Sequence, residues 1–110
     1  MAKDDFFVIA YRILAYLYAC MKSGVLPDED EISFEKLGIH ERYWVSIIDN
    51  LYKKGYIDGV QYVTVLGSDR QIALRDPEIT MDGIEFLQNN STLANAKKFL
   101  KELKEIIPGI

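Results

Sequence analysis

The sequence from residue 6 to residue 21, FFVIAYRILAYLYACM, most constrains the fold, because it contains one charged residue, Arg12, in an otherwise apolar and aromatic run. The chain from Asp5 to Lys22 lacks Gly and Pro, so we expect a long helix there, with Gly24 near its C-terminal end. A helix that is apolar on every side has to bury every side, in a membrane, in a core or against a partner.

A membrane is the least favoured of these three environments. A membrane helix needs roughly 20 mainly apolar residues, whereas this run is shorter, follows the charged sequence KDD and carries Arg12 near its middle. The basic segment and cleavage site of a signal peptide are missing, and the single cysteine, Cys20, cannot form an internal disulfide. We therefore expect a cytoplasmic protein without a membrane span.

Length and charge are those of one ordinary soluble domain. A chain of 110 residues can bury a core but is too short for a catalytic domain plus a regulatory one, so residues 1–110 are predicted to form a single domain. The net charge of -4 and the charged content of 27% are typical neither of a disordered chain nor of a strongly basic one. Bulk charge alone therefore gives no indication of a nucleic-acid partner.

Two shorter helices are predicted next. Ser33 is a natural N-cap and Gly38 a natural stop, which together predict a short helix after the acidic loop DEDE at residues 28–31. A third helix is predicted at about 40–54, ended by Gly55, because its apolar residues recur at i, i+3, i+4 and i+7. These apolar residues are Trp44, Ile47, Ile48 and Leu51.

The chain then changes to a β-prone composition. Val, Ile, Tyr and Thr dominate residues 57–75, and the Gly67, Ser68, Asp69 cluster divides them, which predicts a hairpin. A short helix capped by Thr80 and a final helix at about 91–107 complete the chain. The expected fold class is mainly α with a small β-hairpin (α+β), in the element order of a winged helix-turn-helix with an additional long C-terminal helix.

Three sequence motifs in this order resemble the YjcQ-like family of small winged-helix proteins from Gram-positive bacteria and their prophages. The motifs are YWVSIIDNLYKKGYIDGV, ITMDGIEFLQNNS and KKFLKELKEIIPG, and the resemblance runs from ILAYLY in the first helix to the C-terminal IIPG. The resemblance implies a winged-helix fold with an appended C-terminal helix. It implies no ligand, because fold does not fix function.

Histidine and cysteine are too few here to favour a nucleophilic pair or a metal site built from them. His40 and Cys20 are the only residues of their types, and the wheel places Cys20 on an apolar face, so we expect a buried structural thiol. His40 is expected in the tight turn or at the N-cap of the third helix. The DEDE run lacks the spacing of a calcium loop, and GSDRQ is not a phosphate loop. We expect no enzyme, no cofactor and no metal.

The third helix carries the nucleic-acid hypothesis. Opposite its apolar stripe, the wheel groups residue types that reach base edges and phosphates, with Tyr43 and Lys54 at the flanks. The grouped residues are Arg42, Ser46, Asn50 and Lys53. Arg70 at the tip of the predicted wing would contact the DNA backbone, with Arg75 nearby. We expect a small, phage-associated transcriptional regulator that binds double-stranded DNA.

Charge leaves a second hypothesis open. Residues 39–75 carry five basic and four acidic side chains, a net charge of +1, and Glu41 and Asp49 lie on or near the proposed surface. A dedicated DNA-binding protein usually shows an obvious basic face. The alternative is a non-enzymatic interaction module in which Tyr43, Val45, Tyr52 and first-helix aromatics contact a host or phage protein.

The first helix has two different apolar faces. At about 100° per residue, one face is aliphatic and suits the domain core, and it includes Phe6, Ile13, Leu17, Cys20 and Met21. The other face mixes rings, small residues and Arg12, a composition closer to an interface. Its members are Phe7, Val8, Tyr11, Arg12, Ala15, Tyr18, Ala19 and Lys22.

The predicted final helix offers a partner for this second face. Its apolar residues are spaced by three and four, as in a short coiled-coil seam. The spacing leaves open whether this helix packs within its own chain or across a two-fold axis, and we favour a homodimer. The predicted dimer residues are Phe7, Tyr11, Ala15, Tyr18, Leu93, Leu100 and Leu103.

Overall fold

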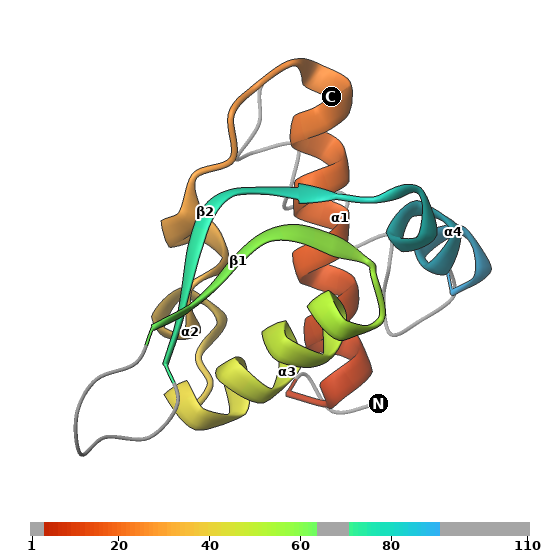
Figure 1. Cartoon of the computed structure of the whole chain (residues 1–110). Coiled ribbons are helices and arrows are strands. Elements are labelled where there is room, and N and C mark those ends of the chain that lie inside the picture. The colour runs from red at the N-terminus through yellow and green to blue at the C-terminus, as the bar shows by residue number, and fades with distance from the viewer. Residues whose placement is uncertain (1–3, 64–70, 91–110) are drawn as a thin grey trace.

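A computed structural model of the chain describes residues 4–63 and 71–90 (Figure 1). The described elements are α1 (Phe6–Ser23), the 3-10 helix η1 (Glu29–Ile32), α2 (Phe34–Leu37), α3 (Glu41–Lys53), β1 (Ile57–Val63), β2 (Gln71–Ile79) and α4 (Met81–Asn89). The predicted α+β class, with a two-stranded hairpin after the third helix, is confirmed. The predicted turn cluster at residues 67–69 and the predicted final helix lie outside the described residues.

Helix α1 is the centre around which the other elements pack. Asp5 is its N-cap, where the carboxylate accepts a hydrogen bond from the Phe7 N–H at 3.3 Å. Gly24 ends it with a left-handed φ of 67°. By length and composition this helix could span a membrane, but eleven of its eighteen residues are buried inside the chain. Strand β2 and helices α3 and α4 all contact it.

Both predicted faces of α1 contain residues that are buried within a single chain, whereas Phe7 and Lys22 of the second face stay exposed. The aliphatic face is buried at Ile13, Leu17 and Cys20, as predicted, and the face predicted to be an interface is buried at Tyr11 and Ala15. The placement of Met21 in the core is wrong, because its side chain is exposed in the last turn, beside the end of the packed core.

The acidic run after α1 forms a helical turn where a loop was predicted. In η1 the Asp28 side chain accepts the Asp30 N–H at 3.0 Å, which caps the turn. The turn buries Ile32, whose carbonyl accepts a hydrogen bond from the Trp44 indole N–H at 2.8 Å. Ser33 then caps α2 and Gly38 ends it, both as predicted. The hydrogen bond from Trp44 connects the acidic segment to α3.

Helix α3 packs on the core through the predicted stripe. His40 is its N-cap, and the imidazole Nδ1 accepts the Arg42 N–H at 3.1 Å. The four apolar residues of the stripe are all buried, which confirms the period-3.6 pattern. The helix ends before Gly55, as predicted, and the chain turns directly into β1. The stripe therefore fixes which side of α3 faces away from the core.

The hairpin contacts α1 through β2 and α3 through both strands, and α1 and α3 also contact each other directly. In Figure 1, β2 lies above β1, with α3 below them. The strands are antiparallel, pairing Ile57 with Ile79 and Val63 with Gln71, so β2 runs four residues beyond the predicted limit at residue 75. A register shift lies between Asp58 and Val60, where Gly59 has a φ of 84°. Only glycine fits there, because a Cβ would lie 2.5 Å from the Arg75 carbonyl oxygen.

Helix α4 docks closely on the turn between α3 and β1. Thr80 is its N-cap, as predicted: its hydroxyl accepts the Gly83 N–H at 3.1 Å and donates to the Gly55 carbonyl. The Thr80 N–H donates to the Tyr56 carbonyl at 3.0 Å. A Cβ on Gly83 would lie 2.4 Å from the same carbonyl oxygen. The helix thus approaches this turn as closely as a glycine allows.

This close approach predicts the effect of Gly83→Ala. The added methyl group displaces α4 from the Tyr56 carbonyl, and we expect the free energy of unfolding to fall by about 2 kcal/mol, as for other overpacked sites. Gly24→Ala is the control, because a Cβ there meets no atom within 4 Å and costs about 1 kcal/mol of left-handed strain. Urea unfolding measures both. A Gly83→Ala variant as stable as the parent would contradict the packing described.

Candidate nucleic-acid interface

The structure brings the predicted DNA-contacting residues of α3 together on its outer face. Arg42, Ser46, Asn50 and Lys53 are all exposed, at successive turns opposite the buried stripe. We call these four residues the α3 row. In Figure 1, α3 lies along the lower edge of the molecule, with the hairpin above it. The Asn50 amide donates to the Ser46 carbonyl at 2.8 Å, which holds this side chain along the helix.

Tyr43, predicted at the flank of this surface, instead contacts the start of α1. Its hydroxyl donates to the Asp4 carbonyl at 2.7 Å, and its ring packs against Phe6 with centroids 6.3 Å apart. Desolvation by burial raises the pKa of Tyr43, and the nearby charges of Asp5 and Asp4 raise it further. Tyr43 therefore fastens the start of α3 to the start of α1. Lys54, at the other flank, is exposed beyond the last turn.

Asp49 lies under the α3 row as a buried carboxylate. It is the one buried charged residue in the part of the chain that the structure describes. The Lys53 ammonium lies 3.0 Å from its Oδ2 atom, and the Tyr62 hydroxyl of β1 donates to its Oδ1 atom. A buried carboxylate is costly unless it is paired and hydrogen-bonded. This cluster joins the outer face of α3 to the hairpin.

The hairpin adds an aromatic surface next to the α3 row. Tyr62 and Val63 are exposed near the described end of β1, and the Tyr62 ring meets the exposed Tyr52 ring edge to face, with centroids 6.1 Å apart. Arg75 is exposed on β2. Arg70, the predicted backbone contact, lies outside the described residues. The described part of the hairpin therefore exposes more aromatic rings than cations at this surface.

The residues predicted for a dimer interface have different environments. Phe7 is 54% exposed and Tyr18 is half-buried, whereas Tyr11 and Ala15 are buried within the single chain. Tyr11 and Ala15 are therefore shielded from solvent without a second copy of the chain. The predicted C-terminal members, Leu93, Leu100 and Leu103, lie outside the described residues.

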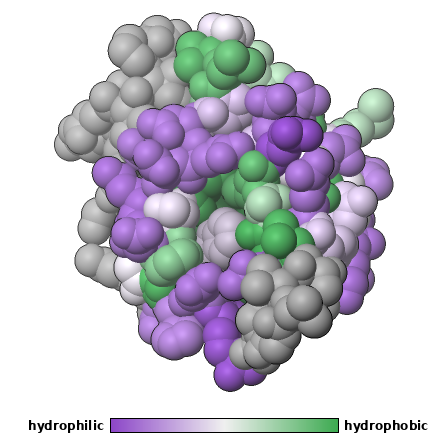
Figure 2. Space-filling view, turned by 60° about the vertical axis from the view of Figure 1, so that its left-hand side comes forward, coloured by the Kyte–Doolittle hydropathy of each residue, from purple (hydrophilic) through white to green (hydrophobic). Residues whose placement is uncertain are grey.

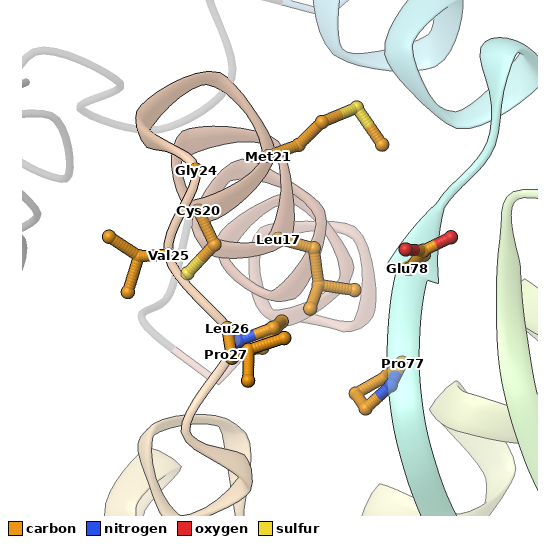
Figure 3. A pocket seen from close by; sticks show the side chains of 9 residues that line it. All are labelled: Leu17, Cys20, Met21, Gly24, Val25, Leu26, Pro27, Pro77 and Glu78. Carbon is orange, nitrogen blue, oxygen red and sulfur yellow. The ribbon is translucent and has the colours of Figure 1, made fainter.

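A pocket at the other end of α1 was not predicted from the sequence. Figure 3 shows it between the last turns of α1, the chain that follows and β2, with a volume of about 230 Å³. Leu26 of the lining is 83% exposed. Figure 2 shows hydrophobic surface near the top of the molecule and in the middle of the same face. The residues that line the pocket are Leu17, Cys20, Met21, Gly24, Val25, Leu26, Pro27, Pro77 and Glu78. The lining is mostly apolar and joins segments about fifty residues apart, which no local pattern indicates.

Cys20 is the buried thiol that the sequence predicts. It is 1% exposed, and burial raises the pKa of its thiol, partly offset by a hydrogen bond with Tyr16. Burial raises the pKa of Tyr16 to about 12, and the Tyr16 hydroxyl accepts the Asp28 N–H at 2.9 Å. Among the residues of 4–63 and 71–90, no three His, Cys, Asp or Glu side chains are grouped to hold a metal ion.

The environment of Cys20 predicts slow thiol chemistry in the folded protein. A thiol with a raised pKa holds less thiolate at a given pH, and burial blocks the reagent. At pH 8 we expect an aromatic disulfide reagent to label the native protein on the order of 100-fold more slowly than the urea-unfolded protein. Because the chain has one cysteine, the absorbance signal reports this site alone. Equal rates in the two states would contradict its burial.

Comparison with known proteins gives one consistent result. The family model described as YjcQ protein matches residues 11–106. "Uncharacterized protein YjcQ" of Bacillus subtilis (strain 168) is 31% identical over 91 residues, which are 82% of this chain and 92% of the relative. No solved structure matches the chain significantly.

Proposed function

The chain belongs to the YjcQ family, and we propose that it is a cytoplasmic winged-helix protein that binds double-stranded DNA as a small, phage-associated transcriptional regulator. The element order supports the winged-helix assignment, because α1, α2 and α3 are followed directly by the two-stranded hairpin. In such folds the third helix enters the major groove and the hairpin lies beside it as a wing.

The α3 row is the observation that carries this proposal. Its four side chains lie on the face of α3 that the core leaves in water, and they combine a guanidinium, an ammonium, an amide and a hydroxyl group. These groups bind phosphates and the edges of bases. The first turn of α3 is anchored by His40 and Tyr43, so Arg42 extends from a rigid part of the fold.

Charge sets the expected strength of binding. Arg42, Lys53 and Lys54 are the cations of α3 and its C-cap, and the charge of Lys53 is paired with that of Asp49. Few phosphate contacts give weak affinity for random sequence, with a shallow dependence on salt concentration. Specific recognition would then depend on base contacts from Arg42, Ser46 and Asn50.

The charge reversal Arg42→Glu tests the DNA proposal. We expect it to weaken binding of a labelled duplex at low salt by at least about tenfold, the range for a lost Arg contact. Glu in the first turn suits the helix dipole, so the loss reports on DNA rather than on folding. Lys22→Glu is the matched control: it makes the same charge change in the last turn of α1, at the opposite end of the molecule (Figure 1). Fluorescence anisotropy at several salt concentrations measures both.

Two results would overturn this proposal. The first is the absence of binding by the parent protein even at low salt, and the second is an equal loss of affinity in Arg42→Glu and Lys22→Glu. Either result would favour the alternative of a protein-interaction module. For that alternative the exposed surface of Tyr52, Tyr62 and Val63 is the described contact region.

The proposal includes a homodimer, since two copies of α3 would match a palindromic site. Among the predicted α1 contacts, Phe7 is the most exposed and Tyr18 is half-buried, so Phe7 is the residue most available to a second copy. Light scattering after size exclusion should give twice the 12.6 kDa chain mass at micromolar concentration. We expect Phe7→Asp to give the monomer mass. A monomeric parent protein would refute the dimer and leave DNA binding to be judged separately.

A further inference from the structure

We propose that Asp49 is a specificity-determining residue of the α3 surface: its buried carboxylate neutralises Lys53 and so keeps that ammonium from strengthening non-specific binding to DNA phosphates. This inference rests on the proposed DNA-binding function. In the sequence, Asp49 stands out only as a negative charge near the proposed surface, which is unfavourable for binding DNA.

The geometry makes Asp49 a fixed counter-charge. Its side chain is 5% exposed, whereas that of Lys53 is 62% exposed, so the ammonium lies at the surface and the carboxylate beneath it. The Tyr62 hydroxyl donates to the other carboxylate oxygen, and the Tyr62 ring packs against Tyr52. Because strand β1 holds the carboxylate in place, it cannot follow Lys53 outward toward a ligand.

A phosphate must therefore compete with Asp49 for Lys53. Contacts between cations and phosphates form on any DNA sequence, and each one steepens the salt dependence of binding. A Lys53 whose charge is balanced in the free protein adds little to this sequence-independent attraction. Base contacts by the remaining residues of the α3 row then make up a larger share of the binding energy, which favours discrimination between sequences.

The test measures the slope of log K against log salt concentration for a random-sequence duplex. In Asp49→Asn the amide still accepts from the Tyr62 hydroxyl, but the charge on Lys53 is no longer balanced. We expect the slope to steepen by about 0.9, the value for one phosphate contact, and affinity at low salt to rise several-fold. The double variant Asp49→Asn, Lys53→Gln should return to the parent slope, because the unbalanced ammonium is removed.

The matched control is Asp58→Asn, the same substitution at an exposed position of β1. We expect its slope to equal that of the parent, and a slope as steep as that of Asp49→Asn would overturn the proposal. Weaker binding by Asp49→Asn would also overturn it, because the carboxylate would then only support the fold.

Lys53→Gln keeps the test decisive if Asp49→Asn fails to fold. With Asp49 intact, this variant should change the slope by less than about 0.3, whereas loss of a full phosphate contact gives about 0.9 and would refute the proposal. A parent protein that binds no DNA at any salt concentration refutes the proposed function itself. That result is distinct from a parent protein that binds while Asp49→Asn leaves the slope unchanged, which refutes this inference alone.

Discussion

The burial of α1 by its own chain is the constraint on which the rest of the structure depends. A helix with apolar side chains all round has to be covered on all sides, and here α3, β2 and α4 contribute to that cover. Covering α1 uses one stripe of α3 and leaves the opposite face in water. The α3 row is exposed for this reason, so the arrangement of the core determines where a binding surface lies.

A small set of polar contacts then fixes how the covering elements sit. Tyr43 and Trp44 each donate to a carbonyl from an earlier segment, and Tyr16 accepts an N–H from the chain after α1. Thr80 joins α4 to the turn after α3. The bond of the buried Trp44 indole also satisfies a polar group that packing withdraws from water. These contacts hold the third helix and the hairpin in one arrangement, as the proposed binding surface requires.

Sequence reasoning succeeded where the physics is local. The caps at Ser33, His40 and Thr80 act within a few residues, and the stripe of α3 follows from helical periodicity alone. The motifs that resemble the YjcQ-like family led to the correct family. Asp49 could not be interpreted in this way, because its hydrogen-bond partner Tyr62 lies thirteen residues away on a strand. The helical periodicity of the sequence places Asp49 beside the α3 row. It cannot show that a residue of β1 contacts this carboxylate.

The same limit explains the other differences. The exposed Met21 follows the core period of α1, but it lies at the rim of the pocket next to β2, where packing leaves its side chain in water. The extension of β2 to Ile79 depends on the irregularity at Gly59, where the Arg75 and Pro77 backbone approaches the glycine too closely for any side chain. The pocket near Cys20 likewise joins two distant segments. Non-local packing decides all three, and one sequence does not reveal it.

The most direct test of the account is to locate the DNA contact on the protein. Amide chemical shifts of isotope-labelled protein, followed by NMR during titration with a short duplex, report each residue separately. If α3 binds DNA as proposed, we expect the largest shift changes between Arg42 and Lys53, with little change around Val25 and Leu26 at the far end of α1. Changes confined to that far end, or none at low salt, would contradict it.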